Sequence, residues 1–169
     1  QIYHSGTNSF ITEQGTGSLY ISATNLNLRS TASETYLTAV DNGAVTLYHD
    51  NTEKLATTSY GIDISGSVVA DTHTASVTGS QTANFSTYQN FVWTLTGNIT
   101  LANPTTEKTG QTGFFIFIHS GGARTVSLGT DYETAGGAGL TLSSASGAVD
   151  IVPYVVQSAG NILLGAPQL

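Results

Sequence analysis

The sequence predicts an all-β protein in two parts: an elongated β-shaft of short strands over residues 1–75 and a compact, β-sandwich-like knob over residues 76–169. Three observations support this prediction. Charged residues make up 9% of the chain, compared with roughly 25% in an ordinary soluble domain, and Ser, Thr, Asn and Gly replace the long polar side chains that favour helices. Threonine and the eight tyrosines suit pleated sheets. Turn residues recur at short intervals, and the apolar pattern changes near residue 75.

The charge and cysteine content exclude several classes of function. Four basic and eleven acidic residues give a net charge of −7, so the chain lacks the basic surface that binds nucleic acid. The longest apolar runs are far shorter than the roughly 20 residues that span a bilayer, and we expect no membrane insertion. The absence of cysteine removes disulfides, thiolate nucleophiles and cysteine-ligated zinc. No cofactor is predicted.

In the first part, short apolar alternations follow one another at a spacing of roughly eight to ten residues, which is typical of many short strands. The best hairpin signal is Asn42-Gly43, because both residues tolerate the positive φ of a type I′ turn. A second turn is predicted at Asp50–Thr52. The predicted strands are residues 9–12, 19–21, 26–28, 36–40, 44–48, 54–57 and 62–64.

Strands this short cannot form an interior from one copy of the chain. Many present only two large apolar side chains on one face, as Leu26 and Leu28 do, whereas ordering each residue costs about 1–2 kcal/mol. Three identical chains wrapped around one axis would bury these side chains against one another; a monomeric solenoid would need a tighter internal repeat. The trimer-core candidates are Ile11, Leu19, Ile21, Leu26, Leu28, Leu47, Leu55, Ile62 and Ile64.

The second part has longer strands and its own core. Residues 71–80 are small and polar, which predicts a connector. Residues 89–96 and 99–101 are predicted strands around a Gly97-Asn98 turn, with Phe91, Trp93 and Leu95 on one face. The continuous apolar run 114–118 is typical of a strand buried on both faces. Further strands are predicted at 125–128, 140–142, 149–156 and 161–164, enough for a small β-sandwich.

One segment resembles a known family. Residues 42–62, followed by Ile64-Ser65-Gly66, contain in order NGAV, LYHDN, KL, TT and a closing glycine-hydrophobic pair. This order resembles a module of tail-fibre and related structural proteins of tailed bacteriophages, in which the segments read LYYDN and G-hydrophobic-x-V-T-G; His49 and Ile64-Ser65 depart from that pattern. The upstream segment 15–28 is similar to the unit that often precedes the module. The resemblance covers residues 3–66.

The resemblance implies a trimeric protein on the virion exterior that contacts other virion proteins and the host surface, with a cell-surface glycan as the candidate ligand. We therefore expect a noncatalytic fibre or spike component. The alternative is a capsid decoration or tail-hub protein that clamps subunits together. Removing residues 76–169 separates the two: an adhesin would lose host adsorption, whereas a clamp would lose virion stability. A polysaccharide depolymerase is the third reading.

Candidate reactive residues are few. A depolymerase needs two carboxylates held about 5 to 10 Å apart, and Asp131 with Glu133 is the best local pair, but the surrounding glycines indicate a solvated loop. We predict no catalytic residue and no enzyme activity. The four histidines lack an i, i+2 or i, i+4 pair, so no metal site is predicted within one chain; three-fold symmetry could still gather His49 or His73 from three copies.

Recognition residues are predicted on loops of the second part, because loops on a rigid β-scaffold usually carry recognition. Tyr132 lies in a glycine-rich stretch without apolar partners, which predicts a displayed ring. The two candidate loops are residues 119–124 and 130–139. The receptor-contact candidates are His119, Arg124, Asp131, Tyr132 and Glu133.

Overall fold

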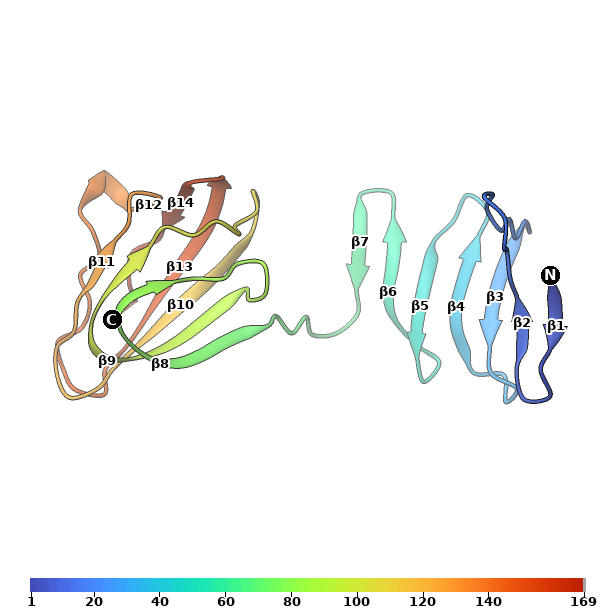
Figure 1. Ribbon diagram of the computed structural model, residues 1–169, viewed down its shortest axis with the longest axis horizontal. Coiled ribbons are helices and arrows are strands. Elements are labelled where there is room, and N and C mark those ends of the chain that lie inside the picture. The colour runs from blue at the N-terminus through green and yellow to red at the C-terminus, as the bar shows by residue number, and fades with distance from the viewer. Residues whose placement is uncertain (169) are drawn as a thin grey trace. The chain divides into compact units, whose positions relative to one another are not determined.

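A computed structural model describes residues 1–168. The chain divides into two compact units, Gln1–Val68 (unit 1) and Val69–Leu169 (unit 2). Both units are built from β-strands (Figure 1), and the described residues contain no α-helix. The all-β prediction is confirmed.

Unit 1 is made of two antiparallel sheets. The first is a hairpin of β1 (Ile2–His4) and β2 (Ser9–Ile11). The second is a five-stranded meander in which each strand pairs with the next along the chain (Figure 1). Its strands are β3 (Asn25–Arg29), β4 (Thr35–Val40), β5 (Val45–His49), β6 (Thr52–Thr58) and β7 (Gly61–Ile64). The strand predicted at 19–21 does not form, since no other segment pairs with it.

The register of the meander places its large aliphatic side chains on one face. Leu28 lies opposite Leu37, Leu37 opposite Leu47, and Leu47 opposite Leu55. Leu55 in turn lies opposite Ile64. Directly opposed residues point to the same side of a sheet, so these side chains form a row across all five strands. We call this row, with Leu26 and Ile62 in phase with it, the apolar face of unit 1.

Type I′ geometry is found in the turn between β5 and β6, and not in the turn between β4 and β5 for which it was predicted. The hairpin predicted around Asn42-Gly43 is confirmed, since β4 and β5 pair antiparallel across it. Its turn is not type I′, because Asn42 has a φ of 56° but Gly43 does not have positive φ. Glycine fits closely at position 43, because a Cβ there would lie 3.0 Å from the Cβ of Val40, tighter than an ordinary contact. Asp50 and Asn51, with φ of 50° and 55°, form the two-residue loop between β5 and β6, as a type I′ turn requires.

Unit 2 contains one seven-stranded mixed sheet that curls around its core (Figure 1), instead of the two packed sheets of a sandwich. Its order is β11-β9-β10-β13-β14-β12. β8 lies off this path and pairs with β9 over most of its length, whereas β10 and β11 pair with the first and last parts of β9. The pairs β8–β9, β9–β10, β9–β11 and β12–β14 are parallel. The strands are β8 (Thr72–Thr82), β9 (Asn90–Ala102), β10 (Thr112–His119), β11 (Val126–Leu128), β12 (Tyr132–Glu133), β13 (Val149–Ser158) and β14 (Asn161–Leu164).

Several local predictions for unit 2 are wrong. The predicted connector 71–80 is largely β8, because His73, Ala75 and Val77 point inward, alternate with exposed hydroxyl residues and pair along β9. Gly97-Asn98 forms no turn: β9 continues through it, and the register with β8 shifts there. Gly97 lies so close to the side chain of Thr78 that a Cβ would collide. Residues 140–142 form no strand, although Leu140 and Leu142 pack against the core.

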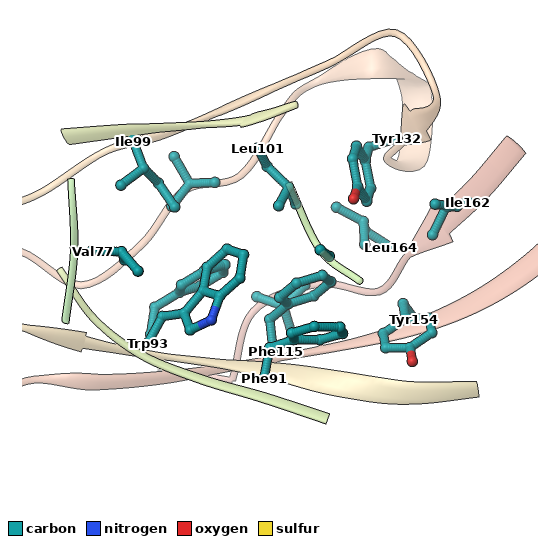
Figure 2. Close-up of a cluster of buried hydrophobic side chains, with 14 of the residues drawn as sticks. Val77, Phe91, Trp93, Ile99, Leu101, Phe115, Tyr132, Tyr154, Ile162 and Leu164 are labelled. Carbon is teal, nitrogen blue, oxygen red and sulfur yellow. The ribbon is translucent and has the colours of Figure 1, made fainter. Parts of the chain in front are cut away.

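The core of unit 2 lies inside the curl of the sheet (Figure 2). Phe91, Trp93 and Leu95 share one face of β9, as predicted, and Phe91 stacks on Phe115 with ring centroids 4.9 Å apart. The crossover of residues 83–89, which the parallel β8–β9 pair requires, contributes Phe85 to this core. Run 114–118 is buried on one face only, since Phe114 is 37% exposed.

Candidate functional site

The five receptor-contact candidates lie in two separate places on unit 2. His119 ends β10 and Arg124 lies in the loop after it, in which Ser120 N donates to Leu95 O on β9. The loop after β11 holds Asp131, whose N–H donates to Asn103 Oδ1 just beyond the end of β9. The two groups therefore meet different parts of β9. They do not form one site.

His119 is buried and joins a polar cluster that holds the loops together. Its Nε2 lies 2.8 Å from Asp150 Oδ2, and both side chains are fully buried. The backbone N–H of Arg124 donates to His119 Nδ1 at 3.1 Å, so Nδ1 is the acceptor and Nε2 carries the proton. Ser143 donates its hydroxyl and its backbone N–H to Asp150. Both ring nitrogens are occupied, which leaves His119 no free atom for a receptor or for acid–base chemistry.

Arg124 folds back over its own loop. Its Nε and Nη2 donate to Ser120 O at 3.1 and 2.7 Å. Two guanidinium donors are thereby used in closing the loop of residues 120–124, and the side chain is half-buried. The loop is fixed by these bonds and by the buried cluster beneath it.

Tyr132 and Glu133, but not Asp131, line a cavity of about 530 Å³ between β11 and the glycine-rich segment that follows β12. This volume is in the range of ligand pockets, about 300–1,000 Å³. Val126, Leu128 and Leu140 supply apolar surface, and Ser127 with Thr134 supplies hydroxyls. Gly137 and Gly139 have positive φ, and Gly139 N donates to Thr134 Oγ1. We call this cavity the β11–β12 pocket.

Tyr132 forms the buried wall of the β11–β12 pocket and is not displayed as predicted. It is 5% exposed, and its ring packs edge-on against Phe115 (Figure 2). Strand alternation turns this residue inward because its neighbours Asp131 and Glu133 point the other way. Burial, followed by the negative charges of Glu107 and Asp131, raises the pKa of Tyr132 well above its usual value. The hydroxyl has no partner among residues 1–168.

Asp131 and Glu133 lie on the outward side of this segment, as predicted for an extended pair. Asn103 fixes the loop before them, since its Nδ2 donates to Thr130 Oγ1 and its Oδ1 accepts from Asp131 N. Glu133 is exposed and lines the pocket. The pocket therefore offers one carboxylate, two hydroxyls and an apolar wall.

The trimer-core candidates are poorly covered within one chain. In residues 1–68, all of which the structure describes, Thr46 and Ala56 are the only buried residues. Among the candidates, Ile62 is 63% exposed, Leu28 49% and Leu47 42%. Ile11, Leu19, Ile21 and Ile64 are also exposed, whereas Leu26 and Leu55 are half-buried. An isolated copy of unit 1 has almost no interior.

Sequence reasoning missed the residues that organise the loops of unit 2. Asp150 was detectable, because a carboxylate inside the apolar run 149–152 needs a buried partner. Its partners His119 and Ser143 are 31 and 7 residues away, and no local spacing connects them. Ser127 and Thr134 also line the pocket without any sequence signal.

The histidines do not gather around a metal within the chain. His73 accepts the indole N–H of Trp93 at 3.0 Å and packs against Tyr88. Within residues 1–168, no group of three or more His, Cys, Asp or Glu side chains is placed to hold a metal ion. No helix in the described part of the chain has the length and apolar character to cross a membrane.

Comparisons with protein families, with curated proteins and with solved structures gave no match for this chain.

Proposed function

We propose that this chain is a noncatalytic structural and adhesion component of a tailed-bacteriophage virion fibre or spike, and that it acts as a homotrimer. Unit 1 forms the elongated shaft and unit 2 the knob. The knob recognises a host-surface glycan. The proposed location is the virion exterior, where the shaft adjoins other virion proteins.

The exposed apolar face of unit 1 is the observation that carries the proposal. Leucines and isoleucines from five consecutive strands lie in register on one side of a sheet, and Leu47 and Ile62 are 42% and 63% exposed. Exposed apolar surface of this extent in a soluble protein marks an interaction site. The same residues belong to the segment 3–66 that resembles the phage-fibre module.

The β11–β12 pocket supports the adhesion role. Hydroxyls of Ser127 and Thr134 and the carboxylate of Glu133 can exchange hydrogen bonds with sugar hydroxyls, while Leu128 and Leu140 cover apolar sugar faces. Several copies on one particle compensate for weak binding at each pocket.

Light scattering coupled to size-exclusion chromatography tests the proposal on the full chain. We expect the mass of a trimer for the native chain and a lower mass for Leu47→Glu, since the change buries a charge at the centre of the apolar face. Val40→Glu is the matched control: Val40 is 51% exposed on the opposite side of the same sheet. A native chain that elutes as a well-folded monomer at all concentrations contradicts the proposal.

A further inference from the structure

The outer side of the unit 2 sheet carries a second apolar surface, which we call the outer strip. It consists of Phe114, Ile116, Ile118, Val149, Ile151 and Val155. Ile116 lies opposite Ile151, and Ile118 lies opposite Val149, on the central pair of strands β10 and β13. The residues between them on each strand point inward and form the core. The strands are therefore apolar on both faces and covered on only one.

The outer strip is open to solvent in its larger part, and Ile116 and Ile118 are half-buried. Val149 is 48% exposed, Ile151 41% and Phe114 37%. Isolated apolar side chains on a surface need no explanation, but contiguous apolar patches of a few hundred Å² mark interfaces. Since the strip lies on the two strands whose other face holds the core, its position is fixed by the fold and does not depend on a loop.

The absence of charge on the outer strip indicates that its partner is a second copy of this chain. Every outward position over 112–118 and 149–157 is uncharged, and Asp150, the one carboxylate on these strands, points inward. The whole chain carries a net charge of −7, so two copies repel each other over most of their surfaces. Burying charges in a contact also costs free energy. Contact through the uncharged outer strips brings no acidic groups of two identical copies together and buries no charge. The strip also has no basic residue that could attract a different acidic protein.

We propose that the outer strips of neighbouring copies pack against one another, so that unit 2 makes its own homo-oligomeric contact. In a homotrimer the three outer strips converge on the three-fold axis, where their apolar side chains interdigitate as they do between packed sheets. This contact rests on the proposed function, because it requires the chain to form a homotrimer. It assigns part of the assembly to a surface separate from the apolar face of unit 1.

The first test compares the full-length variants Ile151→Glu and Val69→Glu by light scattering over a dilution series. Val69 is 90% exposed in the same unit and lies outside the strip, so the same charge is added without touching the proposed contact. We expect Ile151→Glu to raise the dissociation constant of the oligomer by at least about tenfold and Val69→Glu to leave it unchanged. The emission of Trp93, the single tryptophan, which is buried in the core, verifies that unit 2 remains folded.

A second test uses the absence of cysteine in the chain. Under mild oxidation, Ile151→Cys should form covalent dimers, whereas Thr125→Cys, at an exposed position before β11, should not. Ile151→Glu with native mass, together with no cross-linking of Ile151→Cys, overturns the inference while leaving the Leu47→Glu result to decide the proposed function. Conversely, dissociation by Ile151→Glu but not by Leu47→Glu supports the strip and contradicts the unit 1 contact. A monomeric native chain overturns both.

Discussion

His119 and Asp150 form a buried hydrogen-bonded pair that holds the loops of unit 2 to its sheet. His119 Nε2 donates to Asp150 Oδ2 at 2.8 Å, and Ser143 donates to the same carboxylate from the following loop. Arg124 N donates to the other ring nitrogen. Four backbone segments thus meet at two side chains with no exposure to solvent. Such a cluster is stabilising only while all its members are present.

Replacing His119 by leucine should therefore destabilise unit 2 strongly. The change removes the His119 donor from the buried Asp150 carboxylate, and a hydrogen bond to a charged group typically contributes about 1.5–3 kcal/mol. Urea unfolding followed by Trp93 fluorescence measures the loss. His49→Leu, at an exposed histidine of unit 1, is the control and should leave this transition unchanged. A loss below about 1 kcal/mol, the size of one ordinary hydrogen bond, would show that Asp150 does not depend on His119.

At the scale of elements, the β5–β6 hairpin depends on Asn51. This residue holds a φ of 55°, and its Oδ1 accepts the backbone N–H of Thr35 at 2.8 Å, linking the loop to the start of β4. Asparagine tolerates positive φ because its short polar side chain hydrogen-bonds locally. The residue therefore contributes both backbone conformation and a cross-strand bond.

Two substitutions separate these contributions. Asn51→Ala loses both and should destabilise unit 1 by about 1–2 kcal/mol. Asn51→Gly loses only the bond to Thr35 and retains easy access to positive φ, so it should cost less than the alanine variant. Thermal unfolding by far-ultraviolet circular dichroism measures both. Equal losses for the two variants would mean that the conformation of Asn51 contributes nothing.

The elements that sequence patterns predict well are those with local partners. Strands β4 to β7 follow one another through short turns, so alternation and turn residues were enough to place them. The parallel pairs of unit 2 were not predictable in this way. Residues 71–80 form β8 because they pair with β9, which is distant information for a local pattern. The Gly97-Asn98 pair is typical of a turn, and only the register shift between β8 and β9 explains why the strand continues through it. The inward position of Tyr132 likewise depends on its pairing with Ile162.

At the scale of the whole molecule, the two units differ in their tyrosines, and this predicts different responses to alkali. Tyr154 is buried and donates to Gln89 O at 2.6 Å, and burial raises the pKa of Tyr154 to about 12. Tyr20 and Tyr60 of unit 1 are each 85% exposed. An unfolded tyrosine ionises near pH 10, so the stability that Tyr154 contributes is fully present below about pH 10 and is lost as the pH rises through about 12.

Unit 2 should therefore lose stability between about pH 10 and 12, as reported by Trp93 during urea unfolding. Tyr154→Phe should be less stable at neutral pH by about 1 kcal/mol, because its hydrogen bond is lost, and should show a shallower decline in alkali. Tyr60→Phe is the control and should follow the native curve. Identical slopes for the native chain and Tyr154→Phe would contradict a role for this hydroxyl.

The order of strands in the unit 2 sheet sets when this unit can fold during synthesis. β9 pairs with β8 before it and with β10 and β11 after it, and the core is completed by Ile162 and Leu164 on β14. A nascent chain cannot close this interior until residue 164 has left the ribosome. Until then Phe91, Trp93 and Phe115 remain open to water, and slow formation of such long-range pairs prolongs that exposure. The apolar core side chains of unit 2 are thus most open to aggregation while the chain is being synthesised, before β14 is available.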